Sequence, residues 1–294
     1  MIYTLTLNPS LDYLLDTPEF SFGKTNRSTS EAIHFGGKGI NVSYVLKQLN
    51  VPSVCLGFAA GFTGKELLDM LTNAGLCHDF VTLNGDNTRI NVKVRCGNIT
   101  EINAQGPQIS ASDSEALLKK LDRIGEGDIL VLAGSTPKGM DDIYSGIMER
   151  LFSKNVRFVL DTSGKKLVDC LKYKPFLIKP NKDELSEIVG KLLENDEEIV
   201  AAAKKLQAMG ALNVLVSLGE DGALLVDEED RVHRVNAHKI TPINTVGAGD
   251  SMVAGFLAGI DRGYECALQL GNACGAATAM SSMLADAETI KSFI

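Results

Sequence analysis

Short apolar runs rich in β-branched residues alternate with amphipathic stretches along most of this chain. That alternation is typical of a mainly parallel β-sheet whose faces are covered by helices. The expected strands are residues 3–7, 53–57, 129–133, 156–161, 176–179 and 213–217. The expected helices are residues 40–49, 64–74, 112–124, 141–152, 182–189 and 197–209. The pattern therefore predicts an α/β fold.

Two segments interrupt this alternation, at residues 11–35 and 88–103. Both alternate polar and apolar residues with a period of two, as in the run that begins at Arg89. Such a period predicts strands of a sheet that is wet on at least one face. We interpret the two segments as a small β lid attached to the larger sheet. With 294 residues in total, we expect one domain, residues 1–294, that includes this lid.

The charge balance and the cysteines indicate which partners and which cellular environment to expect. The 37 acidic residues outnumber the 29 basic ones, and no run of Lys or Arg occurs. This balance argues against nucleic acid or an anionic membrane as the main partner. The six cysteines form no CxxC pair, which predicts reduced thiols. Neither a basic leader nor a long apolar stretch is present, so we expect a cytoplasmic protein without a signal peptide.

The segment Gly247-Ala248-Gly249-Asp250 precedes an apolar helical run. Its small residues allow backbone N–H groups to approach an anion, and the positive end of the following helix adds to the attraction. Asp250 would repel that anion, so we expect it to accept a proton instead. The alternative is an ordinary turn in which Asp250 caps the helix.

Two further glycine-containing segments imitate nucleotide-binding motifs. Residues 36–41, GGKGIN, lack the third glycine of a dinucleotide fingerprint because Val42 occupies its place. They nevertheless offer Lys38 and Asn41 beside a flexible backbone. Residues 59–66 resemble a phosphate-binding P-loop in spacing, but Glu66 replaces the hydroxyl residue that would hold Mg²⁺. A tight turn between a strand and a helix explains this segment better.

Candidate sugar and phosphate ligands lie near the first strand and on the lid. Asp12 follows the strand at residues 3–7, where its carboxylate can accept hydrogen bonds from vicinal hydroxyls, or it is a turn residue. Lys24, Arg27 and Arg89 flank the glycine-rich segment. They would form a phosphate clamp, or they are solvated surface charges.

Candidate metal and nucleotide ligands follow two later strands. Asn181 and Glu184, three residues apart at a helix start, can hold Mg²⁺ through water. Alternatively they form a capping box. Ser217, Gly219 and Gly222 lie in a strand and glycine turn that fits a nucleotide wall and equally a plain hairpin.

Taken together and in order, these segments resemble the PfkB (ribokinase-like) family of carbohydrate kinases over nearly the whole chain. Residues 36–41 and 245–250 resemble its two signatures. Residues 8–12, 23–27 and 100–107 resemble the branch that contains 1-phosphofructokinase and tagatose-6-phosphate kinase. The resemblance implies a ribokinase-like three-layer α/β/α fold with a mainly parallel central sheet and a small β-sheet lid.

The resemblance also implies site roles. Asp250 would be the catalytic base, with Gly247, Ala248 and Gly249 as the anion hole. The sugar would be held by Asp12, Gly37, Lys38 and Asn41, and its phosphate by Lys24, Arg27, Arg89 and Ser135. Asn181 and Glu184 would position Mg²⁺, and the ATP site would be lined by Ser217, Gly219 and Gly222.

The implied reaction is phosphorylation of a ketohexose monophosphate by ATP, first of all fructose 1-phosphate to fructose 1,6-bisphosphate. Tagatose 6-phosphate and then fructose 6-phosphate are the alternative acceptors. A sugar-phosphate sensor without catalysis is the alternative outside the enzymes, although a base such as Asp250 has no use in a binding protein. Pairing of lids between subunits in this branch implies a homodimer.

Overall fold

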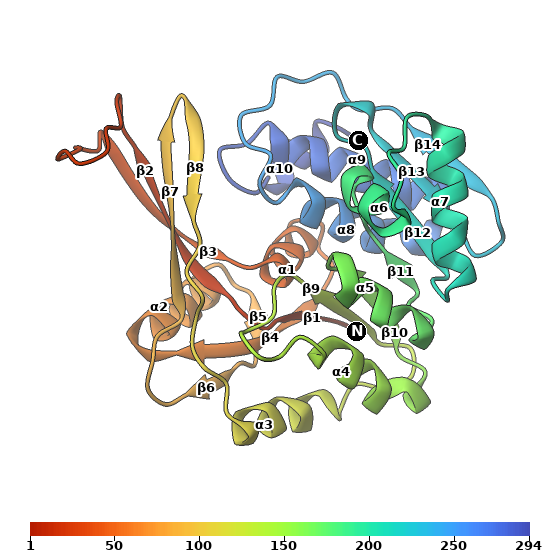
Figure 1. Cartoon of the computed structure of the whole chain (residues 1–294), viewed down its shortest axis with the longest axis horizontal. Helices are drawn as coiled ribbons and strands as arrows, with labels where there is room; N and C mark the ends of the chain where they lie inside the picture. The colour runs from red at the N-terminus through yellow and green to blue at the C-terminus, as the bar shows by residue number, and fades with distance from the viewer.

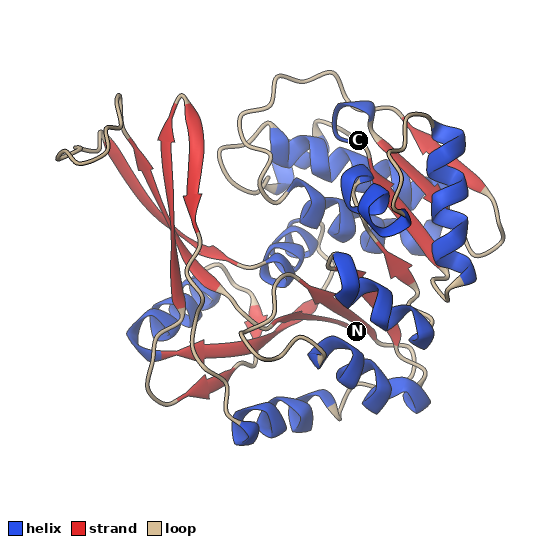
Figure 2. Ribbon diagram, viewed as in Figure 1, coloured by secondary structure: helices blue, strands red, loops and turns tan.

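The computed structural model describes residues 1–294 as a large twisted sheet between two layers of helices, with a second, smaller sheet that projects from one side (Figure 1). The three-layer arrangement is plain when the elements are coloured by type (Figure 2). The predicted α/β fold with a separate small sheet is therefore confirmed.

The large sheet has ten strands, in the order β14-β13-β12-β11-β10-β9-β1-β4-β5, with β6 paired to β4. Its pairs are parallel from β12 to β5, and the last two pairs, β12 with β13 and β13 with β14, are antiparallel. All six predicted strands occur, whereas β5, β6, β13 and β14 were not predicted. The bounds are β1 (Ile2–Thr6), β4 (Ser53–Ala60), β5 (Cys77–His78), β6 (Val81–Leu83), β9 (Ile129–Ala133), β10 (Arg157–Asp161), β11 (Leu177–Ile178), β12 (Asn213–Ser217), β13 (Ala223–Val226) and β14 (Val232–Val235).

Helices cover both faces of this sheet. One layer consists of α1 (Lys38–Gln48), α8 (Ala248–Gly259), α9 (Tyr264–Ala279) and α10 (Ala287–Lys291). The other consists of α3 (Ala111–Leu121), α4 (Ile143–Leu151), α5 (Gly164–Cys170), α6 (Lys182–Val189) and α7 (Asp196–Ala208). Helix α2 (Gly61–Asn73) packs beside β4. None of the helices combines the length and apolar character that a membrane span needs.

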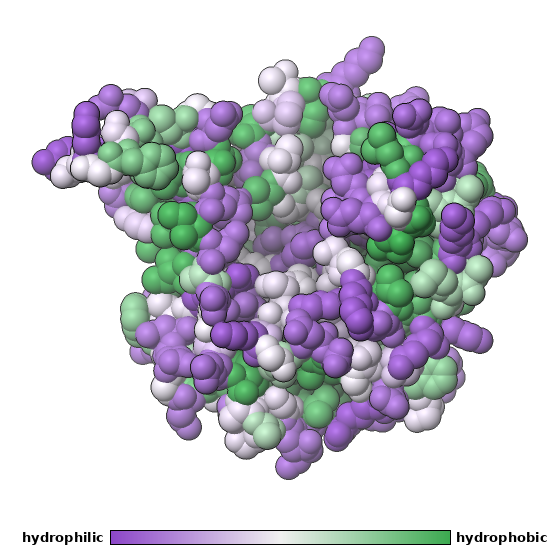
Figure 3. Space-filling view, viewed as in Figure 1, coloured by the Kyte–Doolittle hydropathy of each residue, from purple (hydrophilic) through white to green (hydrophobic).

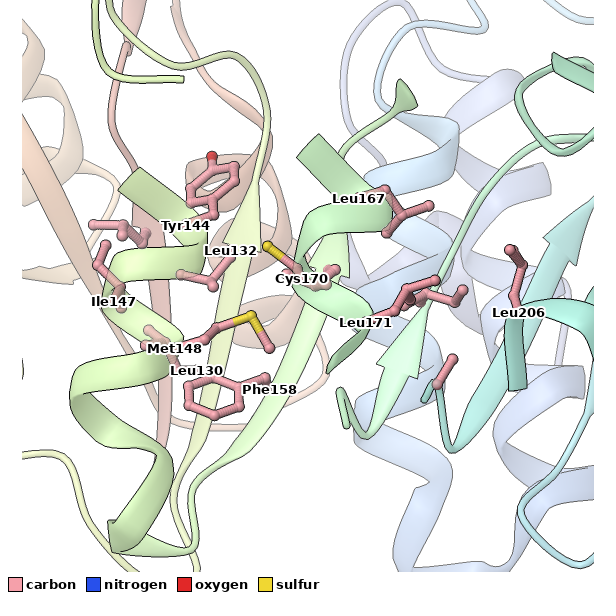
Figure 4. Packing of buried hydrophobic residues seen from close by; sticks show 14 of the residues in the cluster. Leu130, Leu132, Tyr144, Ile147, Met148, Phe158, Leu167, Cys170, Leu171 and Leu206 are labelled. Carbon is pink, nitrogen blue, oxygen red and sulfur yellow. The ribbon is translucent and has the colours of Figure 1, made fainter. Parts of the chain in front are cut away.

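Strand β9 shows why the central strands read as continuous apolar runs. All five of its residues are buried, because successive side chains enter the cores on opposite faces. Leu130 and Leu132 pack with Tyr144 and Met148 of α4 (Figure 4). Val131 instead joins the core under α1 and α8. At about 1.5–3 kcal/mol for each fully buried large side chain, these two cores hold the sheet rigid under the site.

The small sheet, here called the lid sheet, has the order β3-β2-β7-β8. Its strands are β2 (Ser10–Asp16), β3 (Ser30–Gly36), β7 (Arg89–Cys96) and β8 (Asn98–Ile102). Within the segment predicted as 11–35, residues 17–29 form a loop rather than strand. The register places Asp12, Asn91 and Lys93 on one face, and Ile33 and Ile90 on the other. The lid sheet thus has a polar face and an apolar face, as its period of two predicts.

Candidate active site

A cleft of about 640 Å³ lies where the carboxyl ends of the parallel strands face the lid sheet. In parallel sheets this edge is where ligands bind. The space-filling view shows the hollow between the lid sheet and the main body, with largely hydrophilic side chains around it (Figure 3). Its polar lining includes Asn8, Asp12, Lys38, Asn41, Arg89, Asn91, Lys93, Ser135, Lys179, Asn181, Glu184 and Asp250.

Asp250 lies at the start of α8, on the floor of this cleft. The helix begins after Gly247, whose positive φ of 83° suits glycine, and Asp250 is the third helical residue. Its side chain caps nothing: Oδ2 accepts a hydrogen bond from Nδ2 of Asn41, at 2.8 Å. The alternative in which Asp250 is an N-cap is therefore wrong. The residue is 5% exposed and lines the cleft, so a bound hydroxyl can reach its carboxyl group.

The surroundings of Asp250 adjust its proton affinity. Burial and the negative charge of nearby Asp161 raise the pKa of Asp250 to about 7. Asp161, at the end of β10, is itself buried, but Lys179 and Lys38 hold its pKa below the usual value. The ammonium groups of Lys38 and Lys179 lie 3.1 Å and 3.4 Å from its Oδ1. Asp250 is thus a carboxyl group that can bind and release a proton near neutrality.

The glycines before Asp250 leave room for an anion. A Cβ atom at Gly249 would lie 3.1 Å from Nζ of Lys179, so any side chain there would press on the lysine. In the first turn of α8 the N–H of Ala248 donates to the carbonyl oxygen of Thr245 at 3.3 Å, whereas the N–H groups of Gly247 and Gly249 have no backbone acceptor. The helix dipole favours negative charge at the same place. Backbone donors and Lys179 together form a cradle of positive potential beside the Asp250 carboxylate.

On the lid side, Asp12 is held by several donors. Its Oδ1 accepts from Ser10 Oγ at 2.6 Å and from Asn91 Nδ2 at 3.0 Å. Arg89 is half-buried at the base of the lid sheet, where it donates to the carbonyl oxygens of Asn8 and Ala104. The sheet therefore presents an anchored carboxylate and a cation to the same cleft.

The other predicted sugar and phosphate ligands divide into two groups. Gly37, Lys38, Asn41, Arg89 and Ser135 all line the cleft with Asp12. Lys24 and Arg27 do not: both are exposed in the loop between β2 and β3, at the far end of the lid sheet (Figure 1). Within one chain these two cations are not part of the clamp expected for them.

A second cleft, of about 960 Å³, adjoins the first at Asn181, Ser217 and Gly249, which line both. Gly219 and Gly222 lie on its wall, together with small residues of α9 that include Gly275 and Ala276. Gly222, with φ of 98°, is also required by packing, since a Cβ atom there would meet the carbonyl oxygen of Val235. The segment is therefore a hairpin between β12 and β13, and its glycines also line this cleft.

Asn181 and Glu184 form a complete capping box at the start of α6. Asn181 Oδ1 accepts from the backbone N–H of Glu184 at 2.7 Å, and Glu184 Oε2 accepts from that of Asn181 at 2.9 Å. No group of three or more Asp, Glu, His or Cys side chains is close enough together to hold a metal ion by itself. The carboxylate of Glu184 and the amide oxygen of Asn181 both line the cleft, and such oxygens fit Mg²⁺, which keeps several waters and binds through one or two carboxylates and substrate phosphates.

Four residues at this site were missed by the sequence analysis: Asp161, Lys179, Asn91 and Lys93. The first two end strands that were predicted, so the rule that ligands lie at carboxyl ends would have found them. The other two follow Arg89 at a spacing of two, hence on its face of the strand. The sequence therefore carries a signal for all four: the ends of two strands for Asp161 and Lys179, and a period of two for Asn91 and Lys93.

Comparisons with known proteins agree with this geometry. Residues 6–289 match the model of the pfkB family of carbohydrate kinases. The chain belongs to this family and is a sugar-phosphate kinase of its ribokinase-like fold.

Three similar proteins are kinases of phosphorylated sugars. The chain is 46% identical to 1-phosphofructokinase of Bacillus subtilis, over 100% of this chain and 97% of that protein. It is 37% identical to D-tagatose-1-phosphate kinase of Bacillus licheniformis, over 97% and 95% of the two chains. Phosphofructokinase-2 from Escherichia coli, crystallised with substrates and products, superposes with a TM-score of 0.94 at 30% identity and covers 99% of this chain and 97% of its own.

Proposed function

We propose that this protein transfers the terminal phosphoryl group of ATP to the C6 hydroxyl of fructose 1-phosphate, which yields fructose 1,6-bisphosphate. The observation that carries the proposal is the place of Asp250, a buried carboxyl group in the cleft under the lid sheet, one residue from Gly249, which lines both clefts. Two similar proteins are named for ketohexose 1-phosphates, which favours this acceptor.

In this proposal the two substrates meet head to head. The ketose occupies the cleft under the lid sheet, where Asp12 and Asn41 face its hydroxyls and Lys38 and Arg89 supply positive charge. ATP occupies the adjoining cleft, with its phosphates directed at the start of α8. The residues shared by both clefts mark the point of transfer.

Asp250 acts as the base. With a pKa of about 7 before substrates bind, it is largely ionised at slightly alkaline pH, and Asn41 fixes its orientation. The carboxylate orients the attacking hydroxyl and takes its proton as the bond to phosphorus forms. Phosphoryl transfer spreads negative charge over the equatorial oxygens, so the backbone N–H groups of Gly247 and Gly249, which have no backbone acceptor, stabilise the transition state together with Lys179.

Mg²⁺ is the metal that this lining fits, with Glu184 and Asn181 as its nearest protein oxygens through water. When bound, the ion neutralises charge on the ATP phosphates. The capping box holds both side chains in one geometry, so the protein need not order them when ATP arrives.

We also propose a homodimer through the apolar face of the lid sheet. Ile33, Ile90 and Ile102 on that face are 53%, 41% and 61% exposed. A contiguous apolar surface of this kind marks a protein interface. Lys24 and Arg27 lie at the end of the same sheet, so in such a dimer they are available to the partner's cleft rather than to their own.

A coupled assay of ADP formation tests the proposal. We expect the highest kcat/KM with fructose 1-phosphate among fructose 1-phosphate, tagatose 6-phosphate and fructose 6-phosphate, and slow ATP hydrolysis without sugar. Higher kcat/KM with tagatose 6-phosphate or fructose 6-phosphate would contradict the acceptor, and ATP turnover unaffected by any sugar would contradict the reaction.

A further inference from the structure

Lys93 has no part in the mechanism above, yet it is one of the best-placed cations in the cleft. Its side chain is 13% exposed, on the polar face of the lid sheet. The ammonium nitrogen lies 2.9 Å from Oδ2 of Asp12 and 3.8 Å from Oε1 of Glu101. A lysine of such low exposure between two carboxylates is held in one position, unlike a solvated surface lysine.

The Lys93 contact completes the support of Asp12. One carboxylate oxygen of Asp12 is held by Ser10 and Asn91, and the other by Lys93 alone. An ionised carboxylate has about four acceptor positions, so positions remain for the sugar hydroxyls after these three donors are bound. The three donors fix the plane in which those remaining positions point.

The register of the lid sheet explains why Lys93 makes this contact. Asp12 is the β-partner of Asn91, and Lys93 is the next residue of β7 on the same face. The other cations of β7 are engaged elsewhere: Arg95 pairs with Asp16, and Arg89 donates to backbone carbonyls. Lys93 is therefore the one basic side chain that forms an ion pair with Asp12.

We infer that Lys93 is a positioning residue, which orients and charge-balances Asp12 so that its carboxylate recognises the ketose hydroxyls. This inference rests on the proposed function. Neither Lys93 nor Asp12 forms a hydrogen bond or ion pair with Asp250, so Lys93 controls the affinity for the sugar phosphate and not the rate of phosphoryl transfer.

The first test removes the ammonium group of Lys93 and keeps an unbranched apolar side chain. In Lys93→Met, we expect KM for fructose 1-phosphate to rise by about 10- to 100-fold, the effect of losing one charged hydrogen bond, with kcat within about threefold of wild type. Lys93→Arg should restore much of the affinity. The matched control is Lys65→Met, on the exposed side of α2, which should leave both constants unchanged. An unchanged KM in Lys93→Met would overturn the inference.

A double-mutant cycle separates positioning from direct contact with substrate. If Lys93 acts through Asp12, Lys93→Met should add less than about twofold to KM in an Asp12→Asn background. Fully additive losses would mean that Lys93 binds the substrate itself, and would overturn the positioning role. Thermal unfolding of each variant checks folding, and Lys93→Gln provides a polar replacement should the methionine variant not fold.

The same data distinguish the two proposals. If the wild-type enzyme phosphorylates no ketohexose phosphate, both fail. If the wild type phosphorylates fructose 1-phosphate and Lys93→Met keeps the wild-type KM, only the role of Lys93 fails.

Discussion

Replacing Asp161 with asparagine should move the pH dependence of catalysis, although the side chain does not line the cleft. Asp161 is buried at the end of β10 between Lys38 and Lys179, and one of its oxygens, Oδ2, has no hydrogen-bond partner. Its negative charge opposes ionisation of Asp250. Asparagine keeps the shape and removes that charge, while both lysines remain to favour the Asp250 carboxylate.

The magnitude follows from the size of the existing shift. The pKa of Asp250 is raised from 3.8 to about 7, which corresponds to roughly 4 kcal/mol in the relative free energy of the ionised form. Burial is the larger cause and survives the substitution; the charge of Asp161 is the second cause and does not. A like charge at close range shifts a pKa by about one unit or more. We therefore expect the pKa of Asp250 in Asp161→Asn to fall by about one unit.

The assay is kcat/KM for fructose 1-phosphate against pH. Activity in the wild type should rise with pH as Asp250 loses its proton, with a midpoint near its pKa of about 7. In Asp161→Asn the whole profile should be lower, because Lys38 and Lys179 lose their common partner, and its midpoint should be more acidic. Ionisation of the substrate phosphates is identical for both enzymes and cancels in the difference. A midpoint that stays in place, or moves to higher pH, would refute the reasoning.

Two other substitutions test the packing around the site and the fold. Gly249→Ala should keep the fold and lower kcat by about 10- to 100-fold, because the new Cβ atom displaces Nζ of Lys179; steady-state kinetics with thermal unfolding would check both, and normal kcat would contradict it. Asp227 is buried, which by itself would raise its pKa, but hydrogen bonds from His233 and Arg231 lower that pKa to about 2. Because that pKa is below the unfolded value, Asp227 stabilises the fold above about pH 4, and the contribution disappears towards pH 2. Asp227→Asn should cost about 2 kcal/mol at pH 7 and much less at pH 2 in urea unfolding, and equal losses at both pH values would contradict it.

The central fold was predictable because its signals are local. Strand β12, residues 213–217, and helix α6, residues 182–189, occur with the predicted bounds, since apolar runs and capping residues act within a few positions. The tight turn predicted for residues 59–66, in place of a P-loop, is also confirmed. Gly61 begins α2 with φ of 61° directly after β4, so the segment is a tight turn.

Contacts between distant segments were not predictable from periodicity. Asn41 and Asp250 meet across 209 positions of sequence, and Lys38 and Asp161 across 123. No local pattern encodes such pairs, because the order of strands in the sheet brings them together. The position of Lys24 and Arg27 away from the cleft of their own chain was unpredictable for the same reason, since sequence proximity to the glycine-rich segment does not determine where the β2–β3 loop lies.

The role of Asp250 is the claim on which the whole account depends, and Asp250→Asn measures it most directly. Asparagine can still accept a hydrogen bond from Asn41 but cannot take a proton at neutral pH. We predict that kcat falls by about 10²- to 10⁴-fold while the dissociation constants of ATP and fructose 1-phosphate change little. Turnover at the wild-type rate in a folded Asp250→Asn protein would contradict the account.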